Sequence, residues 1–313
     1  LAKTGSAFGS TRRGIAYAYS DKYKKKTLRL GDLLHLDKPH IQSRLKTMLE
    51  YKNLELGGCY HQAPMSYPAL LSWCEKKAEQ FAPYITDTGN YIAAALSNHQ
   101  KVVLEAQLGA MRDIDYGIFP YTSSSSTISA YGPIGAGIPG TLPDHIVGVL
   151  KAYSTCVGAG PFTAEKAMPE KWMESLRKSG GEYGAATGRP RRVGPFDAVA
   201  SAYGLKCQNA DKIALTKLDV LSHMDEIPVI TSYKLNDEII TEFDPLDDLD
   251  SMTPVIQMLP GWNTDISKCR KYEELPENAR KYIETLEHLL NHEIQFISVG
   301  AERNQYLTKG EWL

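Results

Sequence analysis

Three arginines within four residues form the densest basic group of the sequence, in the segment Gly184-Ala-Ala-Thr-Gly-Arg-Pro-Arg-Arg-Val193. Each guanidinium can bind a carboxylate or a phosphate through two parallel hydrogen bonds, and the glycines let backbone N–H groups turn toward the same anion. Holding three such cations together is costly without an anionic partner. The segment therefore predicts a loop that binds a small anion, with a solvated basic turn as the alternative.

A second group, Leu215-Thr-Lys-Leu-Asp219, follows an apolar run typical of a strand. In a string of the form T-K-x-D, the Asp219 carboxylate can accept hydrogen bonds from N1–H and the 2-amino group of guanine. The aliphatic stem of Lys217 can cover one face of the base, and adenine would be rejected. Because the string is short, a surface turn is the alternative interpretation.

The sequence offers little for phosphate or metal binding elsewhere. Residues 1–313 contain no glycine-rich loop of the form G-x-x-x-x-G-K-[ST]. Among the eight histidines, only His288 and His292 have a spacing that could bind a metal on a helix, and no glutamate lies between them as in H-E-x-x-H. We therefore expect a solvated helix face there and no metal site within these residues.

Composition excludes several classes of function. The 313 residues are 42% hydrophobic and 23% charged, with a formal net charge of −2, whereas coating nucleic acid or an anionic membrane needs a basic surface. No apolar run approaches the roughly 18 residues of a membrane helix. The five cysteines are scattered without a C-x-x-C pair, so we expect reduced thiols in a cytoplasmic protein.

Hydrophobic periodicity indicates the elements that must position these groups. It predicts a helical subdomain over about residues 38–100 and an amphipathic helix over 276–290. Residues 9–19 have no period and are typical of a binding loop. The sequence further predicts buried strands and one hairpin, over residues 101–105, 146–152, 212–220, 227–239 (the hairpin, with its turn near Asn236-Asp237) and 295–299. The first of these strands should lead into a site, because open α/β sheets bind ligands at their strand ends.

Several motifs, taken in their order along the chain, closely resemble the adenylosuccinate synthetase family. They cover nearly the whole chain, and together they are far more specific than any one alone. The motifs are Gly9-Ser-Thr-Arg-Arg-Gly-Ile15, Tyr19-Ser-Asp-Lys22, Asp113-Ile-Asp-Tyr-Gly117, Val157-Gly-Ala-Gly-Pro-Phe162, Gly184 to Arg192, Phe196-Asp-Ala-Val-Ala200, Thr216-Lys-Leu-Asp-Val220 and Leu259-Pro-Gly-Trp262. We expect a single α/β domain over residues 1–313, with a mostly parallel central sheet, helices on both faces and the helical subdomain.

The resemblance implies a reaction in AMP biosynthesis. Members of the family convert inosine monophosphate (IMP), L-aspartate and GTP into adenylosuccinate, GDP and phosphate, with Mg²⁺. GTP phosphorylates the 6-oxygen of IMP, and the amine of aspartate displaces the leaving group so formed. The resemblance thus implies a GTP-dependent C–N ligase of purine biosynthesis, a cytoplasmic homodimer with neither nucleic acid nor membrane as a partner.

The same resemblance carries roles onto individual residues. IMP would be bound by Thr11, Lys25, Gln107, Ser123 and Arg189, with Lys25 reaching the phosphate from the partner subunit and Gln107 as the single candidate for a part in catalysis. Aspartate would be bound by Val157, Ala185, Ala186, Thr187, Gly188, Arg189 and Arg191. GTP would be bound by Arg191, Lys217, Leu218, Asp219, Ser298, Val299 and Gly300.

Two departures from the family pattern leave alternatives open. The phosphate loop with the general base aspartate and the Mg²⁺ ligands has no counterpart here, so we expect an N-terminally incomplete chain that does not catalyse the complete reaction by itself. Tyr17, Ala106, Ala186 and Pro195 also differ from the usual residues. The alternatives are a non-catalytic homologue that binds nucleotides or dimerises, and a synthetase for a related purine nucleotide.

Overall fold

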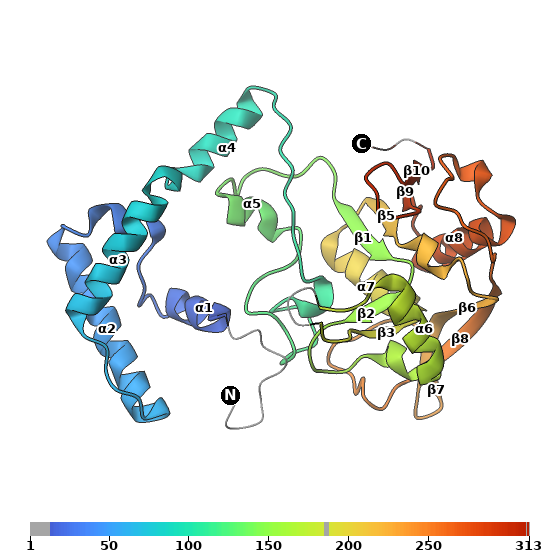
Figure 1. Ribbon diagram of the computed structural model, residues 1–313, viewed down its shortest axis with the longest axis horizontal. Helices are drawn as coiled ribbons and strands as arrows, with labels where there is room; N and C mark the ends of the chain where they lie inside the picture. The colour runs from blue at the N-terminus through green and yellow to red at the C-terminus, as the bar shows by residue number, and fades with distance from the viewer. Residues whose placement is uncertain (1–12, 185–187, 311, 313) are drawn as a thin grey trace. The chain divides into compact units, whose positions relative to one another are not determined.

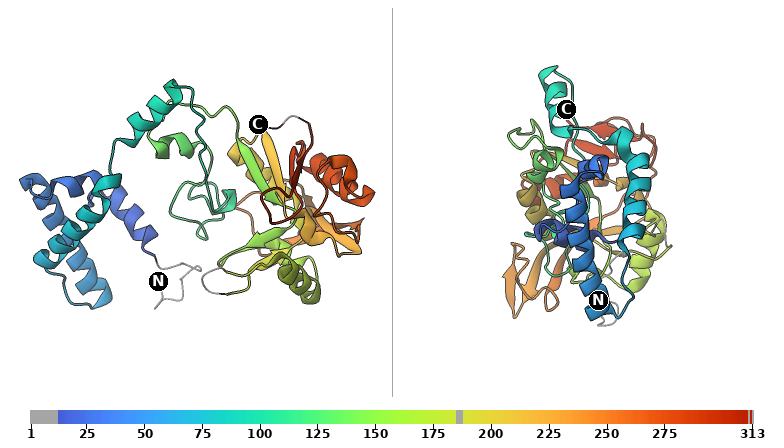
Figure 2. Two further views of the ribbon diagram at one scale, coloured as in Figure 1. Left: turned by 45° about the horizontal axis from the view of Figure 1, so that its top comes forward. Right: turned by 90° about the vertical axis from the view of Figure 1, so that its left-hand side faces the viewer.

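The computed structural model describes residues 13–184, 188–310 and 312 (Figure 1). The chain divides into two compact units. The sheet unit contains Glu105–Gly132 and Leu142–Leu313, and the helical unit contains Thr11–Leu104 and Pro133–Thr141. In the left view of Figure 2, helices α1 to α4 of the helical unit are blue to cyan, and the strands of the sheet unit are green to red.

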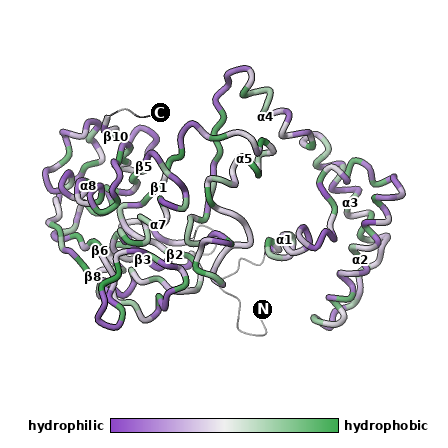
Figure 3. Tube along the Cα trace, turned by 180° about the vertical axis from the view of Figure 1, so that it is seen from behind, coloured by the Kyte–Doolittle hydropathy of each residue, from purple (hydrophilic) through white to green (hydrophobic). Residues whose placement is uncertain are grey.

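Most of the helical unit consists of the helices α1 (Ile15–Tyr23), α2 (Pro39–Tyr60), α3 (Tyr67–Phe81) and α4 (Thr88–Ser97). A boundary between the two units falls after Gly132, within helix α5 (Tyr131–Ala136). Helix α4 begins at a side-chain cap, in which the Asp87 carboxylate accepts from the backbone N–H of Asn90 at 3.0 Å. Buried Ile41, Leu45 and Leu49 recur every fourth residue along α2. Figure 3 shows hydrophilic and hydrophobic stretches alternating along α2 and α3. The helical pattern predicted for residues 38–100 is therefore present.

The central sheet of the sheet unit is mostly parallel. It contains β1 (Val147–Lys151), β5 (Lys212–Thr216), β9 (Phe296–Ser298) and β10 (Tyr306–Thr308), in that order across the sheet. The first three strands are parallel and β10 is antiparallel to β9. This arrangement confirms the predicted α/β class, and the strands predicted near residues 146, 212 and 295 are present.

Two smaller sheets complete the unit. In one, β2 (Ser154–Cys156) pairs antiparallel with β3 (Arg192–Gly194). In the other, β4 (Phe196–Asp197) runs parallel to β6 (Glu226–Leu235), while β7 (Glu238–Ile240) and β8 (Thr253–Pro260) are antiparallel to β6. The predicted hairpin is confirmed, since Asn236 and Asp237 adopt positive φ of 48° and 69° in its turn.

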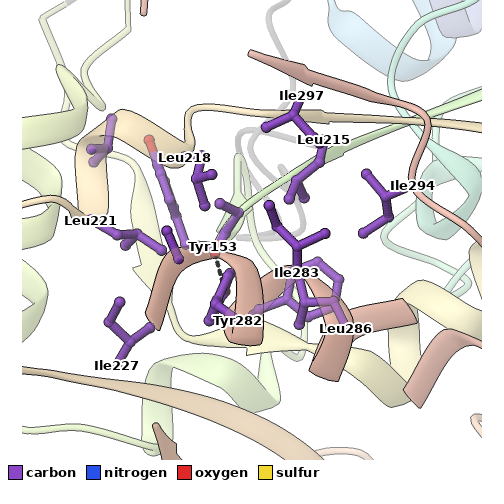
Figure 4. Close-up of a cluster of buried hydrophobic side chains, with 14 of the residues drawn as sticks. Tyr153, Leu215, Leu218, Leu221, Ile227, Tyr282, Ile283, Leu286, Ile294 and Ile297 are labelled. Atoms are coloured by element: carbon purple, nitrogen blue, oxygen red, sulfur yellow. Dashed lines mark hydrogen bonds between the residues drawn. The ribbon is translucent and has the colours of Figure 1, made fainter. Parts of the chain in front are cut away.

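The helices α6 (Glu170–Gly180), α7 (Ala198–Gln208) and α8 (Glu277–Leu290) pack in the sheet unit. The buried side chains of α8 join Leu215 and Ile297 of the central sheet in one core cluster (Figure 4). The Tyr282 hydroxyl donates to the Ala152 carbonyl at 2.6 Å, which satisfies its polar atom inside the core. The predicted amphipathic helix over residues 276–290 is therefore confirmed. It shares a core with the central sheet, and the candidate site lies at the ends of strands in that sheet.

Two predictions of local structure are wrong. Residues 101–105 form no strand, and the Val103 side chain is 88% exposed, because this apolar run joins the two units without pairing to a strand in the described part of the chain. The predicted loop over residues 9–19 is helical from Ile15 onward, where alanines favour a helix; residues 9–12 lie outside the described residues. The strand predicted over residues 212–220 is shorter than expected. It forms β5, which ends at Thr216 because Lys217 has a left-handed φ of 61°.

All five cysteines are free, as predicted. Within the described ranges, no helix combines the length and the apolar character needed to cross a membrane.

Candidate functional site

A single buried carboxylate, that of Glu182, gathers the polar side chains at the carboxyl ends of β1 and β5. Its Oε1 accepts from the Tyr153 hydroxyl at 2.6 Å and from Lys151 Nζ at 2.9 Å, and it lies 3.4 Å from Lys217 Nζ. Its Oε2 accepts from Arg191 Nη1 at 2.8 Å. Glu182 itself is 0% exposed. These five residues are called the Glu182 cluster below.

The contacts determine the charge of the Glu182 cluster. Burial alone would raise the pKa of Glu182, but the donors of Tyr153, Lys151 and Arg191 outweigh it and hold this pKa at about 2. Burial lowers the pKa of Lys151, and the hydrogen bond to Glu182 opposes that effect. With three basic side chains around one carboxylate, the cluster has an excess of positive charge and suits an anionic ligand.

A glycine makes the close approach possible. Gly180 ends α6, and a Cβ added there would lie 2.4 Å from the Tyr153 hydroxyl. The Gly180 carbonyl also accepts from Lys217 Nζ at 2.6 Å. Lys217 is therefore held at both Gly180 and Glu182, while its left-handed backbone directs the chain into the turn that carries Asp219.

The arginine-rich segment closes into a loop whose base includes Glu182. The backbone N–H of Arg191 donates to the Glu182 carbonyl at 2.9 Å, and that of Gly184 donates to the Arg189 carbonyl at 2.8 Å. Gly188 has a φ of 64°, a conformation that glycine adopts without strain. The predicted loop residues Ala185, Ala186 and Thr187 lie outside the described residues.

Arg192 is held by partners within the protein. Arg192 forms a two-pronged ion pair with Glu165, in which Nε donates to Oε2 at 2.6 Å and Nη2 donates to Oε1. Its Nη1 donates to the Gly160 carbonyl at 2.7 Å. Arg192 therefore meets a carboxylate of the protein itself, that of Glu165.

The predicted guanine contacts follow the carboxyl ends of two paired strands. Asp219 lies in the 3-10 turn Leu218–Leu221 after β5; burial raises the pKa of its carboxyl, and the charge of Lys217 opposes this. Ser298 ends β9, which pairs in parallel with β5, and its hydroxyl donates to the Gly300 carbonyl at 3.0 Å. Leu218 and Val299 are both 0% exposed, main chain included.

The candidates for IMP binding belong to both units. Ser123 and Gln107 lie in irregular segments of the sheet unit, where the Ser123 hydroxyl is 2.7 Å from that of Ser125. Lys25 is exposed in the helical unit, and Thr11 lies outside the described residues.

Of the remaining candidates for aspartate binding, Val157 is exposed in the sheet unit, and its carbonyl accepts from Arg112 Nη2 at 3.0 Å. Among the described residues of the sheet unit, the structure thus brings Arg191 and Lys217 together on Glu182.

Sequence reasoning missed three members of the site, namely Lys151, Tyr153 and Glu182. The one available signal was charge: Glu182 is the acidic residue closest to the basic loop, and a group of arginines needs a counter-ion. The segment Lys151-Ala-Tyr153 gave no chemical signal, because its role arises only from the parallel pairing of β1 with β5.

Among the described residues, no group of three or more His, Cys, Asp or Glu side chains could hold a metal ion.

Comparison with known proteins identifies a single family. The family model described as adenylosuccinate synthetase matches residues 2–307. An adenylosuccinate synthetase of Carboxydothermus hydrogenoformans is 40% identical over 304 residues, which are 97% of this chain and 70% of that protein. One of Staphylococcus saprophyticus is 36% identical over 306 residues, 97% of this chain and 71% of that protein. The structure of fully ligated adenylosuccinate synthetase from Plasmodium falciparum matches with a TM-score of 0.87 and 33% identity, over 98% of this chain and 72% of that one.

Proposed function

Because this chain belongs to the adenylosuccinate synthetase family, whose members are ligases of purine biosynthesis, we propose that it joins IMP and L-aspartate to form adenylosuccinate at the expense of GTP. The γ-phosphoryl group of GTP is transferred to the 6-oxygen of IMP, and the amine of aspartate then displaces phosphate from C6 of the purine. The products are adenylosuccinate, GDP and phosphate. A homodimer, in which the partner's Lys25 reaches the phosphate of IMP, and a cytoplasmic location belong to the same proposal.

The observation that carries the proposal is the position of Arg191 and Lys217 on one carboxylate beside the Asp219 turn. Asp219 is proposed to accept from N1–H and the 2-amino group of guanine, while the stem of Lys217 covers the base. Arg191 is proposed to donate two parallel hydrogen bonds to a carboxylate of aspartate. This guanidinium also provides the selectivity for aspartate over neutral amino acids, because a neutral side chain would leave the excess charge of the site without a partner.

Calorimetric titration with GTP and with ATP tests the base-reading assignment. We expect GTP to bind at least tenfold more tightly, and Asp219→Ala to abolish the difference, because adenine lacks the two donors that the carboxylate accepts. Asp211→Ala is a matched control, since Asp211 is an exposed carboxylate paired with His145 at 2.8 Å. A preference for ATP, or a guanine preference that persists in Asp219→Ala, would contradict the assignment.

Product formation tests the reaction itself. Chromatography of a mixture of IMP, L-aspartate and GTP should show adenylosuccinate together with GDP when the protein carries a phosphate loop with the general base, and no adenylosuccinate with residues 1–313 alone. Binding of GTP without any adenylosuccinate by the protein that carries this loop would support the non-catalytic homologue instead.

A further inference from the structure

The Glu182 carboxylate divides its two oxygens between two binding elements. Arg191 Nη1 donates to Oε2 at 2.8 Å, and Lys217 Nζ lies 3.4 Å from Oε1. The side chains of these two cations are 33% and 37% exposed, whereas that of Glu182 is 0% exposed. A buried anion cannot touch a ligand, but it fixes the direction of the cations that do.

We infer that Glu182 is a positioning residue that holds Arg191 for the carboxylate of aspartate and Lys217 for the guanine base. The inference rests on the function proposed above, and it adds a residue that neither binding motif contains. The guanine-reading turn and the arginine-rich loop are thereby fixed by one side chain.

The carboxylate is itself anchored to the central sheet. Tyr153 donates to Oε1 at 2.6 Å, and Lys151, the last residue of β1, donates to the same oxygen at 2.9 Å. The Tyr153 ring is 2% exposed and belongs to the core cluster of Figure 4. Two donors on packed elements therefore hold the carboxylate in place, which gives Arg191 a fixed acceptor and Lys217 a fixed counter-ion.

A purely structural role would be to neutralise the buried positive charge. Loss of the carboxylate leaves Lys151, Arg191 and Lys217 without their counter-ion, so stability falls whether or not Glu182 has a positioning role. The test must therefore separate the charge of the cluster from the geometry of its members.

Three variants make that separation. Glu182→Gln keeps the volume and removes the charge, and Glu182→Asp keeps the charge on a shorter side chain. The double variant Glu182→Gln/Lys151→Met removes one cation as well and so restores the net charge of the cluster. Glu165→Gln is the matched control, because it breaks the neighbouring ion pair with Arg192 and leaves the Glu182 cluster intact.

Calorimetric titration of each folded variant with GDP and with L-aspartate gives the first readout. We expect Glu182→Gln to weaken the binding of both at least tenfold, Glu182→Asp to regain part of the loss, and the double variant to regain thermal stability but neither affinity. Should Glu182→Gln fail to fold, the double variant and Glu182→Asp decide the question. Full affinity in the double variant, or less than a threefold loss in a folded Glu182→Gln, would overturn the inference.

Acetylation of Lys217 by acetic anhydride, measured by mass spectrometry without any ligand, gives the second readout. The rate should rise at least threefold in Glu182→Gln and in the double variant, and stay unchanged in Glu165→Gln, because only the first two remove the ion pair between Lys217 Nζ and the Glu182 carboxylate. An unchanged rate in both would overturn the inference. If the unmodified protein binds neither GDP nor L-aspartate, the proposed function fails, and the labelling still decides whether Glu182 positions Lys217.

Discussion

Arg191 and Glu182 are joined twice, since the backbone N–H of Arg191 donates to the Glu182 carbonyl at 2.9 Å and its Nη1 donates to the Glu182 carboxylate at 2.8 Å. The first contact closes the base of the arginine-rich loop, and the second fixes the direction of the guanidinium. A substitution at Glu182 therefore removes the second contact and keeps the first, which uses only the backbone.

The acid sensitivity of the fold should depend on Glu182. The pKa of this carboxyl is held at about 2, against an ordinary value of 4.5. Its ionisation therefore contributes about 3 kcal/mol to the free energy of unfolding, which is fully present above pH 4.5 and is lost as the pH falls toward 2. Urea unfolding should show Glu182→Gln to be less stable by about this amount at pH 7, with the difference shrinking below pH 4. A difference that stays constant over this range would contradict the assignment.

Gly180 should be intolerant of a side chain for a reason unrelated to charge. A Cβ at this position would lie 2.4 Å from the Tyr153 hydroxyl and 3.2 Å from Glu182 Cγ, so Gly180→Ala must displace the Glu182 cluster. We expect a loss of about 1–3 kcal/mol in unfolding free energy and weaker binding of GDP and aspartate in titrations.

Gly204→Ala provides the control for that substitution. Gly204 lies within α7, and its added Cβ would meet nothing nearer than the Ala110 Cβ at 3.7 Å. Because alanine favours helices, this variant should gain about 0.5–1 kcal/mol and keep both affinities. Equal behaviour of the two variants would show that the approach at Gly180 has no special importance.

Local patterns predicted much of this fold. The short apolar runs of β1 and β5, the hairpin turn at Asn236-Asp237 and the amphipathic face of α8 each follow from the identity of neighbouring residues. The run Val102-Val103-Leu104 has the same composition as a strand but not the structure, because a strand also needs a partner, and pairing is a property of the whole chain.

In the candidate site too, contiguous motifs could be recognised and residues brought together by folding could not. Arg191, Lys217 and Asp219 could be found from motifs, since each motif is contiguous. Glu182 could not be assigned, because its role depends on β1 and β5 being adjacent. Their pairing places Lys151 opposite Thr216, the residue before Lys217. Sequence spacing also could not show that Arg192 is occupied by Glu165.

Guanine binding should weaken in acid at a higher pH than an ordinary aspartate would allow. Burial raises the pKa of Asp219, so protonation removes the acceptor of the two guanine donors before the pH reaches the ordinary value of 3.8. Calorimetric titration with GDP between pH 4.5 and 7.5 should show affinity falling as the pH falls. Asp219→Asn should bind weakly with no such dependence, and an equally steep dependence in that variant would assign the effect to another group.

The buried pair of Asp197 and Tyr233 should oppose Glu182 in its effect on stability. Burial raises the pKa of Asp197 to about 6, although the Tyr233 hydroxyl donates to it at 2.7 Å and the N–H of Ala200 donates at the start of α7. The protonated carboxyl therefore contributes about 3 kcal/mol to the free energy of unfolding, which is fully present below pH 3.8 and is lost as the pH rises through 6.

Asp197→Asn keeps an acceptor for Ala200 and cannot ionise. Urea unfolding of this variant should show a flatter pH dependence between pH 4 and 7. Tyr233→Phe gives the opposite change, because it leaves the charged carboxylate without its hydroxyl donor, and we expect a loss of about 1–3 kcal/mol at pH 7 that diminishes at pH 4. A loss that is equal at the two pH values would show that the Asp197 carboxyl does not titrate in this range, and that packing of the ring alone accounts for the effect.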